Sequence, residues 1–186
     1  VKVNSKTGEV AVIVTGMENG DTAVVLYRDA NGNWVVIKAV VVNGKLTDAG
    51  RAALEPVADE ILVRENRGFD IWGYKAGIDH VGEAIADFDE LIIANDTWYG
   101  PVCPFGPVFD RIDGQELHFW GMTDHARVEP HPFTFTGYLP YHLQSYWVGV
   151  RREMFLSEEW QRYWAELPPM DSYSDAVVKH EGVFTE

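Results

Sequence analysis

The sequence predicts an α/β protein in which a mixed, mostly parallel sheet is flanked by helices and preceded by an N-terminal β-hairpin. Two apolar runs, residues 10–15 and 91–94, have the composition of strands buried on both faces of a parallel sheet. A polar turn, Glu65 to Asp70, precedes the second run by about one βαβ unit. Both segments are therefore expected at the carboxyl ends of the strands, where α/β proteins bind ligands.

In the first half of the chain, strand and helix signals alternate. Asn31-Gly32 between two β-rich runs, residues 22–28 and 34–42, predicts the hairpin. Thr47 with Asp48 predicts the start of a helix that ends at Leu54, before Pro56. The other elements expected here are a strand over 61–64, a helix over 71–80 that Asp70 caps, and a strand over 90–94.

The second half contains longer irregular segments. Residues 97–107 hold three prolines and two glycines and predict an ordered loop of the kind found at active sites. Ser157 starts a helix whose aromatic residues recur at helical spacing, and Pro168 ends it. The other elements expected here are strands over 117–122 and 146–150, a loop over 130–140, and the start of a helix over 171–180.

Composition excludes several classes of protein. The chain has 186 residues, of which 46% are hydrophobic, so it can form one sizeable α/β domain over residues 1–186. Its 15 basic and 29 acidic residues give a net charge of −14, which argues against nucleic-acid binding, although the charge can also serve solubility alone. The single cysteine excludes a disulfide framework and favours the cytoplasm.

No apolar run is long enough to form a transmembrane segment, and peripheral association with the inner face of a membrane stays open. The chain starts at Val1 without an initiator Met and stops in mid-pattern at Glu186. We therefore expect a domain excised from a longer protein.

Two polar segments are candidate binding sites. Asp96, between Asn95 and Thr97, offers an oxygen ligand for Mg²⁺ or Mn²⁺, which are often bound by one or two carboxylates, water and substrate phosphates. Alternatively, Asp96 only caps the following turn. Gly68 permits close approach of the backbone, and Asp70 suits a sugar or ribose hydroxyl. The alternative for Asp70 is a plain helix N-cap.

Other side chains can supply charge, proton transfer or stacking. The cations suited to phosphate oxygens are Lys75, Arg151 and Arg152. The groups that can act as a general base are Asp124, His142 and Glu181. The aromatic residues that can stack on a sugar or base are Trp98 and Tyr99. For each group the alternative is a solvated or structural role.

Five segments in order resemble the rhamnan synthesis protein F family, glycosyltransferases of bacterial cell-surface polysaccharide assembly. These segments are residues 64–70, 91–101, 119–124, 142–146 and 151–164, and the resemblance covers about residues 40–186. The family is similar to GT-A glycosyltransferases, whose Rossmann-like sheet binds a nucleotide-diphosphate sugar and often a divalent metal through an Asp-x-Asp motif. The resemblance thus implies a GT-A-like fold.

The resemblance also implies roles for individual residues. Asp96 stands where the metal-binding motif would be, with one carboxylate instead of two. The residues expected along the donor nucleotide and sugar are Asn66, Gly68, Asp70 and Asn95, and those expected at the donor sugar or acceptor are His142 and Gln144. Residues 22–42 differ from a GT-A fold, which has a helix after its first strand.

The leading hypothesis is a glycosyltransferase that moves a deoxyhexose such as rhamnose from a nucleotide-diphosphate sugar to a growing glycan or lipid-linked glycan. Asp96 would hold the metal and diphosphate, Arg151 or Arg152 would offset charge on the leaving group, and Asp124 or Glu181 would be the base. The alternative is a non-catalytic glycan-binding or assembly module. A metal-dependent hydrolase is less favoured, because no second carboxylate or His cluster is evident.

Overall fold

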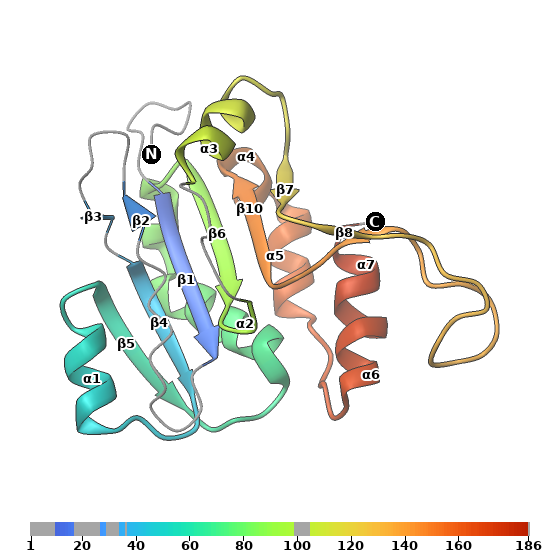
Figure 1. Ribbon diagram of the computed structural model, residues 1–186, viewed down its shortest axis with the longest axis horizontal. Helices are drawn as coiled ribbons and strands as arrows, with labels where there is room; N and C mark the ends of the chain where they lie inside the picture. Colours follow the sequence, from blue (N-terminus) through green and yellow to red (C-terminus); the bar gives the residue numbers. More distant parts are fainter. Residues whose placement is uncertain (1–9, 17–26, 29–33, 36, 99–104, 186) are drawn as a thin grey trace.

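A computed structural model describes residues 10–16, 27–28, 34–35, 37–98 and 105–185 (Figure 1). Its centre is a six-stranded sheet with the order β5-β4-β1-β6-β10-β7. These strands are β1 (Val10–Gly16), β4 (Ile37–Asn43), β5 (Ala58–Arg64), β6 (Glu90–Asn95), β7 (Phe119–Gly121) and β10 (Trp147–Arg151).

Parallel pairing is confined to the four strands β5, β4, β1 and β6. Strand β10 runs antiparallel to both of its neighbours, β6 and β7. Two small sheets, β2 (Tyr27–Arg28) with β3 (Trp34–Val35) and β8 (Asp124–His125) with β9 (His142–Leu143), are also antiparallel. The predicted mixed α/β fold is confirmed, but parallel pairs do not predominate among the described strands.

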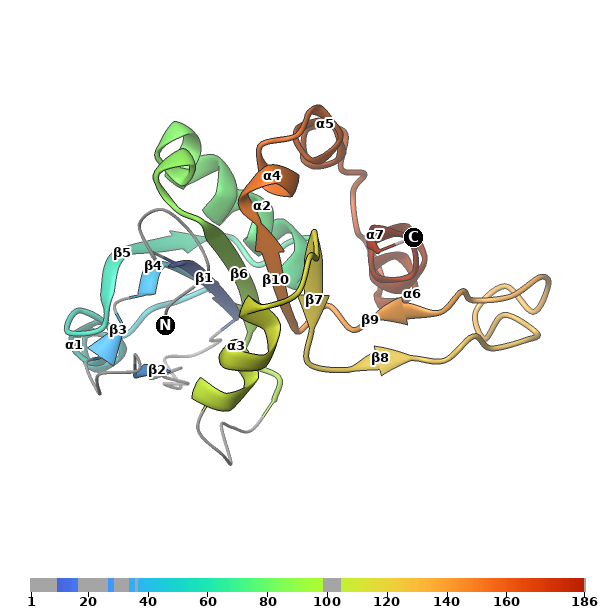
Figure 2. The same ribbon diagram turned by 90° about the horizontal axis from the view of Figure 1, so that it is seen from above.

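Helices cover both faces of the sheet, as the view from above shows (Figure 2). The helical segments are α1 (Asp48–Leu54), α2 (Phe69–Val81), η2 (Gly82–Asp87), α3 (Gly106–Asp113), α4 (Arg152–Phe155), α5 (Glu158–Ala165), α6 (Tyr173–Ala176), η3 (Val177–Glu181) and α7 (Gly182–Phe184). None of the described helices is long and apolar enough to cross a membrane.

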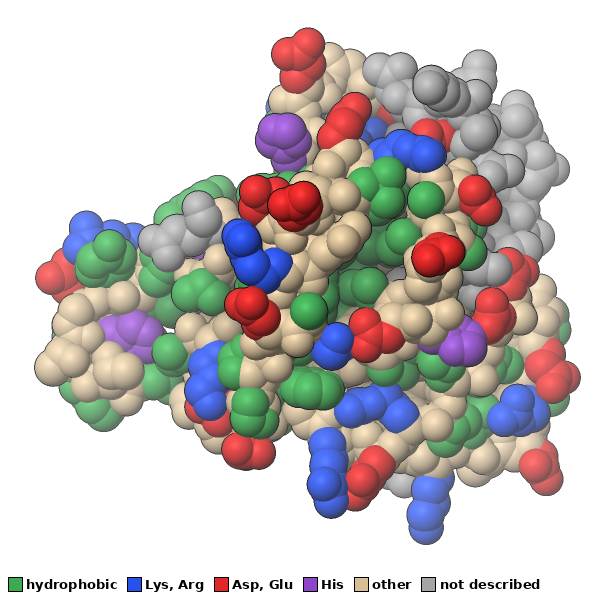
Figure 3. Space-filling view, turned by 180° about the vertical axis from the view of Figure 1, so that it is seen from behind, with side chains coloured by type: hydrophobic (Ala, Val, Ile, Leu, Met, Phe, Trp, Pro, Cys, Tyr) green, Lys and Arg blue, Asp and Glu red, His purple; other side chains and the backbone are tan. Residues whose placement is uncertain are grey.

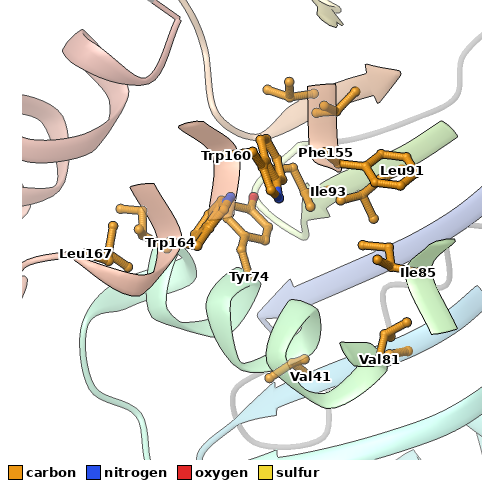
Figure 4. Close-up of a cluster of buried hydrophobic side chains, with 14 of the residues drawn as sticks. Val41, Tyr74, Val81, Ile85, Leu91, Ile93, Phe155, Trp160, Trp164 and Leu167 are labelled. Carbon is orange, nitrogen blue, oxygen red and sulfur yellow. The ribbon is translucent and has the colours of Figure 1, made fainter. Parts of the chain in front are cut away.

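Alternate residues of each strand enter two separate cores, as the two-residue period of a strand requires. In β4, Val40 packs with Leu54 of α1 and with α3, whereas Val41 packs with α2 and α5 on the opposite face. Figure 4 shows the second core, in which Tyr74, Trp160 and Trp164 gather above the sheet. These cores fix α2 against the strands.

The predicted helix starts are partly confirmed. Thr47 Oγ1 accepts a hydrogen bond from the Gly50 N–H at 3.1 Å, and Ser157 caps α5 in the same way. The prediction that Asp70 caps α2 is wrong, because Gly68 is the N-cap and Asp70 lies within the first turn. Its carboxylate is therefore available for another partner.

The N-terminal hairpin is confirmed by the antiparallel pairs Tyr27 with Val35 and Arg28 with Trp34. Its turn lies outside the described residues, as does the segment between β1 and β2 where a GT-A fold has a helix. The β-rich run predicted over 34–42 is divided between this hairpin and β4, a strand of the central sheet.

Between β7 and β10 the chain leaves the body as an arm, defined here as residues 124–143. Figures 1 and 2 show it projecting beside the C-terminal helices. The arm is closed at its base by β8 and β9 and further out by an antiparallel bridge between Val128 and Leu139. The C-terminal helical segment includes a π-helix, η3, and π-helical turns are frequent at functional sites.

Candidate functional site

The candidate site lies at the carboxyl edge of the parallel strands. Strand β1 has β4 on one side and β6 on the other, so successive crossovers reverse direction here, which is where open α/β sheets bind ligands. Asn95, the last residue of β6, donates a hydrogen bond from Nδ2 to Asp70 Oδ2 at 2.9 Å. The two polar segments singled out in the sequence are thus brought together.

A left-handed turn places Asp70 at this edge. Gly68 and Phe69 both have positive φ, 75° and 56°, which is unusual for a residue as large as Phe. A Cβ atom on Gly68 would lie 2.3 Å from Cδ1 of Trp72. The indole of Trp72 donates to the Pro168 carbonyl at 3.1 Å and is held in place. Only glycine fits between this ring and the turn.

The environment of Asp70 disfavours its ionised form. Burial raises its pKa from 3.8 to about 6, the hydrogen bond from Asn95 lowers it, and the charge of Asp96 raises it. The side-chain oxygen of Asn95, Oδ1, accepts hydrogen bonds from the Thr97 N–H at 3.1 Å and from the Thr97 hydroxyl at 2.7 Å. Asn95 is therefore held on both sides, and its amide has a fixed orientation towards Asp70.

Tyr74 joins this edge to the C-terminal segment. It lies one turn after Asp70 in α2, is fully buried, and donates from its hydroxyl to the Ser145 carbonyl at 2.9 Å. Burial raises the pKa of Tyr74 well above its usual value, and the charges of Asp70, Glu181 and Asp96 raise it further. We call these three acidic residues the carboxylate cluster.

Glu181 is held in the carboxylate cluster by Ser145 and lies beside His142. Its Oε2 accepts from the Ser145 hydroxyl at 2.6 Å and from the Ser145 N–H at 3.3 Å. Its Oε1 lies 3.5 Å from Nε2 of His142, which is buried. His142 Nδ1 bonds the Pro140 carbonyl at 2.8 Å, so this nitrogen carries the ring proton. The ring also stacks on His125.

Two other predicted residues lie on the segments that flank this cluster. Gln144 accepts through Oε1 from the Thr123 hydroxyl at 2.6 Å. Asp124 is exposed in the arm and accepts from the Tyr141 hydroxyl at 2.8 Å. Asp124 is thus paired within the arm, whereas the charge of Glu181 raises the pKa of Tyr74. Of the two carboxylates predicted as a base, Glu181 is the one brought together with Asp70.

The structure does not bring the predicted arginines to this edge. Arg151 pairs with Glu90, the first residue of β6, because β10 runs antiparallel. It therefore lies about 17 Å from Asn95 along a strand of this length. Its guanidinium is 3.5 Å from the buried Glu90 carboxylate and donates to the Ile112 carbonyl at 3.0 Å. Arg152 donates to the Phe88 carbonyl. Both side chains are engaged at the amino edge of β6.

Lys75 and Trp98 are also engaged elsewhere. Lys75 forms a 3.0 Å ion pair with Asp79 and lines a groove of about 620 Å³ between α2 and α5. Figure 3 shows a hollow on this side of the molecule with hydrophobic side chains inside. Trp98 packs edge-on against Trp147 at 5.4 Å, which fits its alternative role as a core residue. Tyr99 lies outside the described residues.

Asn66 is exposed in the turn before α2. Two residues of the site were not predicted, Tyr74 and Ser145. The available signals were that Tyr74 follows Asp70 at the four-residue spacing of one helix face, and that Ser145 lies within the segment 142–146. Among the described residues, no group of three His, Cys, Asp or Glu side chains could hold a metal ion.

Comparison with known proteins identifies the family. Searches of curated proteins and of solved structures gave no match. A family model described as rhamnan synthesis protein F matches residues 38–186, which include the turn before α2, the end of β6, the arm and the C-terminal helices. The match covers most of the chain, and the chain therefore belongs to the rhamnan synthesis protein F family.

Proposed function

We propose that this protein is a glycosyltransferase with a GT-A-like arrangement of its sheet. It would transfer a sugar, such as the deoxyhexose rhamnose, from a nucleotide-diphosphate donor to a growing cell-surface polysaccharide. The observation that carries this proposal is the hydrogen bond of Asp70 to Asn95 at the switch point of the sheet, with Tyr74 and Glu181 joined beside it through Ser145. Membership of a family named for rhamnan synthesis supports the same substrate class.

The donor would bind at the end of β6. Asp70 would accept a hydrogen bond from a sugar or ribose hydroxyl, and Asn95 would present its side-chain amide to the same ligand. The hydrogen bond between Asn95 and Asp70 fixes the orientation of both groups. Asp96, directly after Asn95 at the end of this strand, would offer a carboxylate ligand to a divalent cation such as Mg²⁺ or Mn²⁺, with donor phosphates and water as the other ligands. Such an ion would neutralise charge on the departing diphosphate.

The remaining step needs a proton acceptor. The acceptor hydroxyl forms a bond to the anomeric carbon while the bond from that carbon to the diphosphate oxygen breaks. The electron pair leaves with the nucleoside diphosphate, and the hydroxyl proton moves to Glu181. Ser145 donates two hydrogen bonds to Oε2 of Glu181 and holds this carboxylate in position for the transfer.

Thermal unfolding in the presence of single nucleotide-diphosphate sugars, with and without Mn²⁺, tests donor binding. At a hundred times its dissociation constant, a ligand stabilises the folded state by about 2.7 kcal/mol, which raises the melting temperature by roughly 5–10 °C for a chain of this length. The stabilising donor is then offered with a rhamnose-containing acceptor.

The variants Asp96→Ala and Asp124→Asn form a matched pair. Transfer should be lost in Asp96→Ala, with the circular dichroism spectrum unchanged, and should persist in Asp124→Asn. Full transfer by Asp96→Ala would remove the metal and diphosphate role of Asp96. Stabilisation by a glycan but by no nucleotide sugar would support a binding module without catalysis instead.

A further inference from the structure

A second cavity lies between the arm and the C-terminal helices. Its volume is about 300 Å³, at the lower end of the range of ligand pockets, so it has room for a single sugar ring. The residues that line it include apolar ones from both sides, Leu139 and Pro140 from the arm and Val178 and Val183 from η3 and α7. None of its lining residues carries a formal charge.

His131 brings a hydrogen-bond donor to this cavity. It is buried, and its Nδ1 accepts from the N–H groups of Phe133 at 3.1 Å and Thr134 at 3.3 Å. A neutral ring whose Nδ1 accepts carries its proton on Nε2. Among the described residues nothing accepts a hydrogen bond from this Nε2–H. The cavity therefore combines apolar walls with an imidazole ring that two hydrogen bonds hold in place.

Tyr138 adds an aromatic wall. Its ring is half exposed, and the Arg127 guanidinium lies 4.0 Å from the ring centroid, which fixes the ring in place. An aromatic ring with a polar tip offers an apolar face and a hydroxyl to the same ligand. The uncharged lining is notable in a chain of net charge −14, because it suits a neutral ligand better than a phosphate or a uronic acid.

The cavity adjoins the segments that hold the proposed base. Gly182 lines it and directly follows Glu181, and Pro140 lines it and accepts the hydrogen bond from His142. A Cβ on Gly182 would lie 2.9 Å from Cδ1 of Leu139, so the arm and α7 are packed as closely as a glycine allows. A glycan with its reacting hydroxyl at Glu181 has its neighbouring sugars near this cavity.

We infer that this cavity binds a 6-deoxyhexose unit of the acceptor glycan, next to the unit that reacts. The inference rests on the proposed function for the nature of the ligand. The methyl group and apolar ring edge of a 6-deoxyhexose pack against the four apolar residues, and a ring hydroxyl accepts from His131. A sugar that keeps its 6-hydroxyl places that group against Val178 and Val183 without a partner.

NMR titration with methyl α-L-rhamnoside and methyl α-L-mannoside, which differ in the 6-hydroxyl alone, tests the inference. The rhamnoside should bind at least about tenfold more tightly, within the discrimination that an apolar pocket achieves against an added hydroxyl. Val183→Asp and Tyr138→Ala should each weaken rhamnoside binding at least tenfold. Phe135→Ser, a change at an arm residue that is 77% exposed and does not line the cavity, should bind like wild type.

Equal binding of the two glycosides, or unchanged binding by both cavity variants, would overturn the inference. Far-ultraviolet circular dichroism verifies that the cavity variants are folded, and Val183 and Tyr138 are both partly exposed, so their replacement leaves the core intact. Rhamnoside binding without transfer from any donor would refute the proposed function and leave the cavity assignment standing. Transfer to rhamnosides by both cavity variants with an unchanged KM would refute the cavity assignment and leave the proposed function standing.

Discussion

Replacing Asp70 by asparagine is expected to stabilise the folded protein at pH 8 and to leave its stability nearly unchanged at pH 3. Burial, with a smaller contribution from the charge of Asp96, raises the pKa of Asp70 from 3.8 to about 6. That difference corresponds to about 3 kcal/mol of unfolding free energy. Asparagine keeps an oxygen that can accept the hydrogen bond from Asn95, and it carries no charge to desolvate.

The sign follows from which state holds the proton. At pH 3 and below, Asp70 is largely protonated in both states and costs nothing. Between pH 4 and 6 the unfolded chain loses this proton while the folded protein keeps it, so the stability of the wild type falls as pH rises. Above pH 6 the carboxylate is ionised in both states, and the full cost of its burial remains.

Urea unfolding of the wild type and Asp70→Asn, measured from pH 3 to pH 8 with EDTA present, checks this expectation. The variant should gain stability progressively over this range, up to about 3 kcal/mol, or roughly 6–12 °C in melting temperature. Asp124→Asn is the matched control, because an exposed substitution changes stability by about 0.5 kcal/mol or less. A pH-independent difference, or a less stable Asp70→Asn at pH 8, would refute the argument.

Three further changes are predicted. Gly68→Ala should lower the free energy of unfolding by about 1–3 kcal/mol, because φ is 75° and a Cβ meets a tryptophan ring. Gly137→Ala, at φ 69° but with open space around its Cβ, should cost less in the same urea titration. Arg151→Met should lower the free energy of unfolding by about 3–5 kcal/mol, because it leaves Glu90 buried without its cation. Donor binding measured by calorimetry should be unchanged, and weaker donor binding would show that Arg151 contributes to the site. Glu181→Gln should lower kcat by about 10²–10⁴ with donor affinity intact, and an unchanged kcat in single-turnover assays would exclude it as the base.

The position of the site could be predicted from the sequence because it depends on a rule of parallel sheets. An apolar run that ends in Asn95 and a strand followed by Asp70 both end at one edge whenever the connection between them is a right-handed crossover. The hydrogen bond between these two side chains is a direct consequence. The caps at Thr47 and Ser157 were equally local, since each depends on a hydroxyl three residues before the N–H it accepts from.

The errors arose where local patterns do not specify direction. A strand pattern is the same in either orientation, and β10 runs opposite to β6, so Arg151 and Arg152 emerge at the wrong edge for a diphosphate site. An aspartate before an apolar run is expected both at a helix N-cap and in the first turn of a helix. Here the left-handed Gly68 is the N-cap, so Asp70 lies in the first turn. The contact of Tyr74 with Ser145 joins residues 71 positions apart and has no local signature.

The reversed direction of β10 has a consequence for which part of this chain can vary. Because β10 enters the sheet where β6 leaves it, with the Asn95 N–H donating to the Tyr146 carbonyl at 3.0 Å, the chain before β10 reaches the ligand-binding edge directly. The arm is inserted just upstream and joins the sheet only at its base, so its length and composition can change without altering strand pairing. On the proposed function, a change in the arm would alter which glycan is bound while the strands that would hold the donor keep their pairing.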